Sequence, residues 1–236
     1  MVERPMGVAL HDTVVSALGT AIVSGQYPAN RVLTLDEVGC EHGVSRSVVR
    51  EAVRVLESMG MVTSRRRVGI TVQPAEHWNV FDPMVIRWRL DVGDRTATLL
   101  SLSELRKGFE PAAAALAATR ATPHHCRLMA GAVSDMVMHG RSGDLEAYLT
   151  ADMNFHRTML DASGNEMFRA LSGVVSEVLM GRTHHGMMPA KPEITAIALH
   201  DEVARAIRMG EAEQAERAMR AIIDEAASAV ADDDIA

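Results

Sequence analysis

The chain has 236 residues, of which 47% are hydrophobic, and a formal net charge of −7 at pH 7. No stretch approaches the roughly 20 apolar residues of a membrane-spanning helix, so we expect a soluble protein of one or two domains. The N-terminal residues lack the apolar core of a signal peptide, and we therefore expect a cytoplasmic protein.

A helix-turn-helix is predicted near the N-terminus. Apolar residues at helical spacing predict a first helix that includes residues 14–23. A short helix follows at about residues 35–41, and Gly43 suits the tight turn after it because glycine adopts positive φ freely. Ser45 is the expected N-cap of the next helix. That helix would bury an apolar stripe made of Val48, Val49, Ala52, Val53, Leu56 and Met59.

Arginines mark the outward face of this second helix. Arg46 and Arg50 lie one turn apart near its start, and Arg54 continues the row. At the N-terminus of a recognition helix, an arginine that pairs with guanine contributes about 1–3 kcal/mol of discrimination. Strands at 61–64 and 70–73 flank a hairpin tip rich in arginine. A single arginine is usually just solvated, but their joint placement predicts binding to double-stranded DNA.

This segment resembles the GntR family of bacterial regulators in residues 44–52 (VSRSVVREA), 56–57, 60–62 and Gly69. The resemblance implies a winged helix-turn-helix in a homodimer that binds a short palindromic operator, with Gly69 entering the minor groove. The sequence departs from the family pattern at residues 34–37 and 39–40, which leaves the expected fold unchanged. The expected DNA-binding residues are Ser45, Arg46, Ser47, Arg50, Arg54, Arg66 and Gly69.

The pattern changes after the hairpin. Pro74 prevents a continued strand ladder, and helical periodicity dominates from Asp82 onward. Helices are expected at 82–91, 95–120, 123–139, 143–162, 165–185, 191–209 and 211–231. The predicted fold is therefore mostly α, with a winged helix-turn-helix domain over residues 1–76 and an all-α bundle over residues 77–236.

Three residues of the predicted bundle suit a metal site. Asp152 and His156 are four residues apart and share a helix face, and His200 lies on an amphipathic helix beside the bundle interior. A carboxylate and two imidazoles are suitable ligands for one divalent ion. Taken alone, such histidines are more often core or surface residues without a metal.

Residues 102–223 resemble the FCD domain, the effector-binding module of the FadR-like branch of GntR regulators. The resemblance rests on residues 105–113 (LRKGFEPAA), on the spacing of Asp152 and His156, and on the helix that His200 opens. It implies a divalent metal on these three side chains, with zinc expected first and nickel or manganese left open.

The family's fourth ligand, a histidine on the last helix, is replaced by Ile222 here. A bound ion would therefore keep open positions for water or an anionic effector. His184 or His185 would be a substitute ligand, although both also suit an exposed helix end, where a histidine is favoured by the helix dipole.

Arg106 and Arg182 are the expected effector-binding residues, because an arginine fork pairs well with a carboxylate. A structural ion pair with a neighbouring helix is the alternative for Arg106. Residues 77–82 and 85–88, with the missing fourth histidine, resemble regulators of galactonate and related sugar-acid operons. We expect a repressor that a small carboxylate, such as a sugar acid, releases from DNA. A metal-responsive regulator and a metal-dependent enzyme are the alternatives, and we expect no enzyme, because no second carboxylate, nucleophile pair or phosphate loop accompanies the metal residues.

Overall fold

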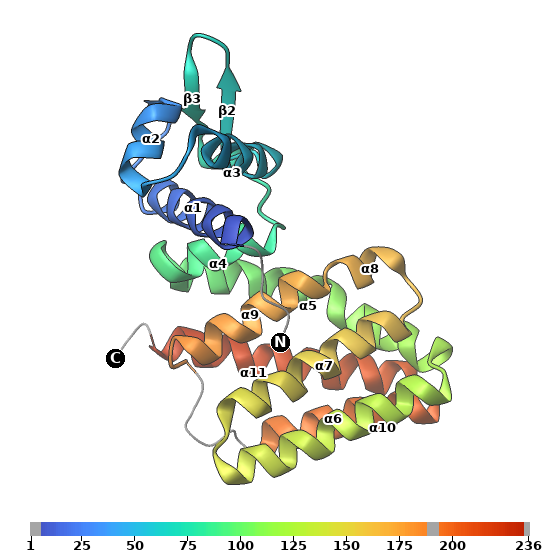
Figure 1. The fold of residues 1–236 in the computed structure, drawn as a ribbon. Coiled ribbons are helices and arrows are strands. Elements are labelled where there is room, and N and C mark those ends of the chain that lie inside the picture. Colours follow the sequence, from blue (N-terminus) through green and yellow to red (C-terminus); the bar gives the residue numbers. More distant parts are fainter. Residues whose placement is uncertain (1–5, 188–193, 234–236) are drawn as a thin grey trace. The chain divides into compact units, whose positions relative to one another are not determined.

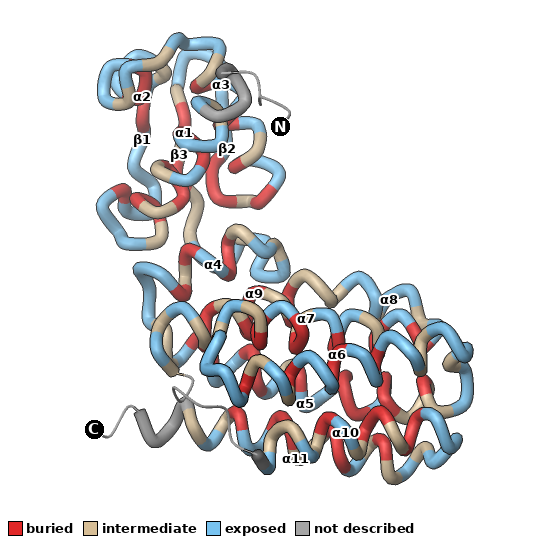
Figure 2. The backbone as a smooth tube through the Cα atoms, turned by 60° about the horizontal axis from the view of Figure 1, so that its bottom comes forward, coloured by how far each residue is buried: buried red, intermediate tan, exposed pale blue. Residues whose placement is uncertain are grey.

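The computed structural model describes residues 6–187 and 194–233 (Figure 1). The chain divides into two compact units between Asp94 and Arg95. Exposed and buried residues alternate along the helices of each unit (Figure 2), as expected for amphipathic helices that cover a core. No helix in the described ranges is long and apolar enough to cross a membrane.

The first unit contains helices and one small sheet. Its elements are α1 (Met6–Val23), β1 (Val32–Leu33), α2 (Leu35–His42), α3 (Arg46–Ser58), β2 (Val62–Arg65), β3 (Gly69–Val72), a 3-10 helix (Ala75–His77) and α4 (Pro83–Val92). The three strands are antiparallel in the order β1-β3-β2. The sequence did not predict β1, because a two-residue strand carries no periodic pattern.

The helix-turn-helix forms where it was predicted. Thr34 and Glu37 make a reciprocal capping box at the start of α2, and Gly43 ends that helix with φ of 63°. Ser45 caps α3 by accepting a hydrogen bond from the Val48 backbone N–H. The apolar face of α3, which includes Val49, packs with α1 in the core of this unit.

The first unit extends beyond the expected boundary at residue 76, because α4 packs on α1. Trp88 of α4 is buried against Gly19, where a Cβ atom would lie only 2.4 Å from the indole ring. Val85 and Trp88 belong to the same apolar core as α1 and α3. The absence of a side chain at residue 19 therefore makes this helix contact possible.

The second unit is all-helical in its described residues, as predicted. Its elements are α5 (Arg95–Arg120), α6 (Pro123–Ser142), α7 (Leu145–Ala162), α8 (Glu166–Ala170), α9 (Ser172–His184), α10 (Ile194–Met209) and α11 (Ala212–Asp233). Its core consists mainly of Ala, Val, Leu, Ile and Met side chains. The most extensive helix contacts join α5 to α11, α6 to α7, and α10 to α11.

One predicted helix of the bundle is wrong. The expected helix 165–185 is divided into α8 and α9 at Leu171, whose backbone (φ −79°, ψ −2°) departs from ideal helical values. The Leu171 N–H bonds to the carbonyl of Phe168, three residues back, which tightens the chain at this point. The expected start of the following helix at residue 191 lies outside the described residues.

Candidate functional site

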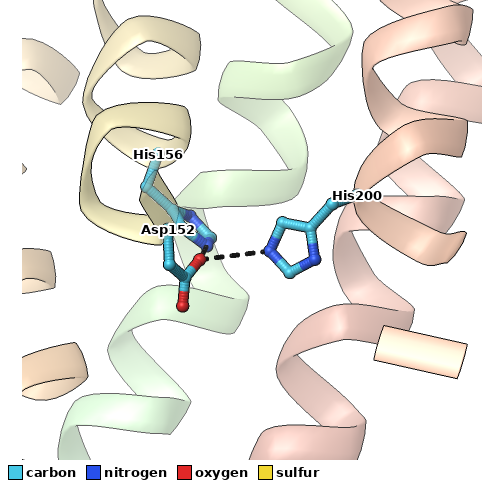
Figure 3. Close-up of side chains that lie close together, drawn as sticks. All are labelled: Asp152, His156 and His200. Atoms are coloured by element: carbon cyan, nitrogen blue, oxygen red, sulfur yellow. Dashed lines mark ion pairs between the residues drawn. The ribbon is translucent and has the colours of Figure 1, made fainter. Parts of the chain in front are cut away.

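The three predicted metal residues come together inside the second unit. Asp152 and His156 project from α7 toward His200 on α10 (Figure 3). Asp152 Oδ1 lies 3.2 Å from His200 Nε2 and 3.4 Å from His156 Nε2. All three side chains are buried, and their ligand atoms lie within 4.8 Å of one another. Such spacing allows all three atoms to contact one ion.

The atoms that face one another in this cluster lack hydrogen-bond partners among the described residues. They are Asp152 Oδ1, His156 Nε2 and His200 Nε2. The distances between them are short, but their directions do not meet the requirements of a hydrogen bond. Leaving a buried polar atom unpaired costs about 1–3 kcal/mol, and a cation in contact with all three would remove that cost.

The opposite ring nitrogens of both histidines have acceptors. His156 Nδ1 lies 2.6 Å from Glu110 Oε2, and His200 Nδ1 lies 2.7 Å from the carbonyl oxygen of Ala196. Since both acceptors are oxygens, Nδ1 donates its proton in each ring, and Nε2 is left for a metal. Metal-binding histidines are usually held in this way, so the residues fit a divalent ion.

Charges around His156 also favour a cation in this cluster. Burial lowers the pKa of His156, but the negative charges of Glu110 and Asp152 outweigh it and raise the pKa to about 9. Burial likewise raises the pKa of Asp152, and its contacts with the two histidines outweigh that effect and lower it. The negative charges that raise the pKa of His156 would equally favour a bound cation, which would take the place of a proton on Nε2.

Two buried arginines interact electrostatically with each other, and one of them also interacts with Asp152. Arg106 on α5 and Arg182 on α9 are both buried, and Arg106 Nη2 and Arg182 Nε have no hydrogen-bond partner within the described ranges. Burial lowers the pKa of Arg182, the positive charge of Arg106 lowers it further, and Asp152 opposes this shift. The two guanidinium groups thus repel each other, which an anion between them would relieve.

Arg106 forms a structural ion pair, but not with a neighbouring helix as the alternative expected. Arg106 Nε donates to Glu110 Oε1 at 2.5 Å, within helix α5 rather than to a neighbouring helix. The attractions of Arg106 and His156 overcome the effect of burial and lower the pKa of Glu110 to about 2. The expectation that no second carboxylate accompanies the metal residues is wrong, because Glu110 contacts His156. The signal for Glu110 was its position four residues after Arg106, on the same face of the helix.

Neither substitute histidine joins the cluster. His184 is half exposed at the end of α9, and its Nε2 lies 3.3 Å from Glu146 Oε1. His185 is the residue that caps the same helix, and it does not belong to the metal-capable group. Ile222 is buried in the core and offers no ligand atom. The described part of the chain therefore offers three candidate metal ligands in this cluster.

The predicted DNA-facing residues of α3 differ in their surroundings. Arg46 forms a two-point ion pair with Asp36 of α2. Arg54 donates to Glu51 at 2.6 Å. Arg50 is exposed, and none of the described residues forms a hydrogen bond or ion pair with it. Sequence reasoning missed Asp36 because its partner lies on a different helix.

The side chains at the start of α3 also contact each other, since the Ser45 and Ser47 hydroxyls lie 2.8 Å apart. Arg66 lies exposed in the turn between β2 and β3. The wing is joined to α3 by Glu57, which accepts a 2.5 Å hydrogen bond from the Ser64 backbone N–H. These contacts hold the hairpin and the recognition helix together.

Gly69 has a structural role at the start of β3. Its φ is 115°, and a Cβ atom there would lie 2.6 Å from the carbonyl oxygen of Leu33 in β1. Only glycine fits this close approach between the two strands. The predicted contact of Gly69 with the minor groove stays a prediction beside this packing role.

Comparisons with known proteins agree with both units. A model of bacterial regulatory proteins of the gntR family matches residues 10–72, and the FCD domain matches residues 101–225. The chain is 30% identical over 216 residues to the galactonate operon transcriptional repressor of Escherichia coli (strain K12), which covers 90% of this chain and 93% of that protein.

Two further relatives extend the comparison. The chain is 26% identical over 200 residues to a probable D-xylose utilization operon transcriptional repressor of Paenarthrobacter nicotinovorans, covering 84% of this chain and 78% of that protein. Among solved structures, Streptococcus agalactiae GntR has a similar fold, with a TM-score of 0.51, 24% identity, and coverage of 92% of this chain and 99% of that one. The chain belongs to the GntR family of bacterial transcriptional regulators and carries an FCD domain.

Proposed function

We propose that this regulator is a homodimeric repressor that leaves a palindromic operator when its FCD domain binds a small carboxylate, with sugar acids as the expected class. The observation that carries the proposal is the buried cluster of Asp152, His156 and His200, in which one potential ligand atom of each residue lacks a hydrogen-bond partner. The buried Arg182 also interacts electrostatically with Asp152. The relation to a galactonate operon repressor supports both repression and the effector class.

Asp152, His156 and His200 would hold a divalent ion, for which zinc is the first expectation because it accepts nitrogen and oxygen donors readily. When bound, the ion supplies positive charge and open coordination positions for an oxygen ligand. A sugar acid offers a carboxylate and an adjacent hydroxyl for these positions. Arg106 Nη2 and Arg182 Nε, which lack partners in the described structure, would donate charge-assisted hydrogen bonds to the same anion.

The operator would be read by the winged helix-turn-helix of each subunit. Arg50 and Arg66 are exposed side chains on α3 and at the wing tip, so base and phosphate contacts require no break of an existing ion pair. A twofold dimer would present two recognition helices to the two half-sites of a palindrome.

A thermal-shift screen of metal-analysed protein tests the effector class. Galactonate, other sugar acids and lactate are added singly, because a ligand that binds only the folded state raises the melting temperature. We expect one sugar acid to stabilise the wild type, and this shift to disappear in Arg106→Ala and in His156→Ala. If no acid shifts the melting temperature of metal-loaded protein, the metal-responsive regulator becomes the better proposal.

The enzyme alternative is not supported. The chain belongs to a family of transcriptional regulators, whose two domain models match residues 10–72 and 101–225. Membership of this family supports a regulatory role, not a catalytic one, for the buried aspartate and histidines in our proposal.

A further inference from the structure

Glu110 connects the two charged parts of the bundle. This carboxylate is fully buried on α5, and its two oxygens contact two different partners. Oε1 accepts from Arg106 Nε at 2.5 Å, and Oε2 accepts from His156 Nδ1 at 2.6 Å. Arg106 lies one turn away on the same helix, whereas His156 lies on α7. One side chain thus joins an expected effector residue to an expected metal ligand.

We propose that Glu110 is a positioning residue that aims His156 Nε2 at the metal and holds the Arg106 guanidinium in place with its second oxygen. The proposal rests on the proposed metal binding by Asp152, His156 and His200. An ion pair within a helix needs only one carboxylate oxygen, and it explains the contact with Arg106. The contact of the second oxygen with His156 on α7 is not needed for that ion pair, and orienting the imidazole ring explains it.

The two histidines of the cluster are held by different means, which makes the role of Glu110 specific. His200 donates from Nδ1 to the Ala196 carbonyl, an acceptor that its own helix supplies. The Nδ1 of His156 has a side-chain acceptor from another helix. Removing Glu110 therefore releases one of the three ligands and leaves the other two in place. Loss of such an outer hydrogen-bond partner commonly weakens metal affinity 10- to 100-fold.

Zinc affinity, measured by competition with a chromophoric chelator, tests the proposal. Glu110→Gln removes the charge at constant size, and Glu110→Asp keeps the charge on a side chain one methylene shorter, which cannot span both partners. We expect zinc affinity to fall about 10- to 100-fold in both variants. Glu146→Gln is the matched control, because Glu146 pairs with His184 on the surface of the same unit, and its zinc affinity should equal that of the wild type.

The possible outcomes separate this proposal from the function on which it rests. Wild-type zinc affinity in both Glu110→Gln and Glu110→Asp overturns the positioning role. Wild-type affinity in Glu110→Gln alone, whose amide oxygen still accepts from His156 Nδ1, would overturn the need for the charge and leave the role to the acceptor oxygen. Weak binding by Glu110→Gln together with wild-type affinity in Glu110→Asp also overturns it, because charge alone would then suffice. If His156→Ala binds zinc as tightly as the wild type, the proposed metal centre itself fails, whatever the Glu110 variants do.

Substitution of Glu110 leaves buried Arg106 without its ion-pair partner, so the variants are first checked for folding by circular dichroism. A measurement on the unchanged protein gives an independent test if they do not fold. In zinc-loaded wild type with 15N-labelled histidine, we expect His156 to carry its proton on Nδ1 and the metal on Nε2. Zinc on Nδ1 of His156 would overturn the proposal, because Glu110 occupies that side of the ring.

Discussion

For Gly69, the effect of a substitution on stability and its effect on DNA binding distinguish a packing role from a contact with DNA. Gly69→Ala should lower the free energy of unfolding by about 1–3 kcal/mol, because a Cβ atom would lie 2.6 Å from the Leu33 carbonyl at a φ of 115°. Gly43→Ala is the control, since its φ is 63° and nothing lies within 4 Å of the added atom. Urea unfolding measures both variants, and the loss should be larger at residue 69. Equal losses would mean that the close approach to Leu33 is relieved at little cost. Weaker DNA binding with unchanged stability would support a minor-groove contact instead.

At the scale of elements, the ion pair between α2 and α3 bears on recognition. Both oxygens of Asp36 accept hydrogen bonds from Arg46, and this two-point ion pair restricts the directions in which the guanidinium can reach a base. Asp36→Ala should therefore reduce discrimination between a duplex selected from a randomised library and an unrelated duplex. It should also steepen the salt dependence, because a freed arginine adds about one phosphate contact. Fluorescence anisotropy at several salt concentrations measures both effects.

A double-mutant cycle controls for the lost negative charge at Asp36. If Asp36 acts through Arg46, then Asp36→Ala should have no further effect on discrimination once Arg46→Ala is present. Glu51→Ala, which frees Arg54 from a pair within α3, reports the effect of removing an acidic partner farther along the helix. If Asp36→Ala still changes discrimination when residue 46 is already alanine, then Asp36 does not act by orienting Arg46.

The exposed arginines of α3 and the wing should have separable effects. Arg50→Ala should cost about 1–3 kcal/mol on the selected duplex and little on unrelated DNA, as expected for a base contact. Arg66→Ala should weaken binding to both duplexes alike, as expected for a phosphate contact at the wing tip. Both side chains are exposed, so melting temperatures should stay at the wild-type value. Retained operator preference in Arg50→Ala would remove that residue from base recognition.

The elements that were predicted correctly are those with a local signal. Capping residues and apolar periodicity located α2 and α3, and the four-residue spacing put Asp152 and His156 on one face of α7. The break at Leu171 is followed closely by Gly173, but a single glycine within an apolar periodic run does not by itself end a helix. The contact of Glu110 with His156 and that of Asp36 with Arg46 depend on which helices pack together, and a single sequence does not contain that information in readable form. Tertiary contacts between helices therefore account for these two missed contacts, whereas β1 was missed because it is only two residues long.

At the scale of the whole molecule, the metal cluster and the DNA-binding helices lie in different compact units, each with its own apolar core. Removing the metal with a chelator should therefore leave the winged helix-turn-helix folded and its operator affinity nearly unchanged. Any response to a sugar acid should disappear, since in the proposed function the ion supplies part of the effector site. Anisotropy with the selected duplex, before and after chelation and after return of zinc, measures this. Loss of operator binding on chelation would indicate a metal-responsive regulator.

The proposed mechanism requires that effector binding and operator binding change each other's affinity by the same factor. If an effector weakens operator binding by some factor, the operator must weaken effector binding by the same factor, because both describe one coupling free energy. Coupling in such proteins is typically about 1–3 kcal/mol, which corresponds to roughly a 5- to 150-fold change in affinity. Titrating duplex into protein with and without galactonate, and galactonate into protein with and without duplex, measures the factor twice. Two unequal factors would rule out a single coupled equilibrium. Equal factors that both fall to one in Arg106→Ala would place the origin of the response at the buried guanidinium group beside Glu110.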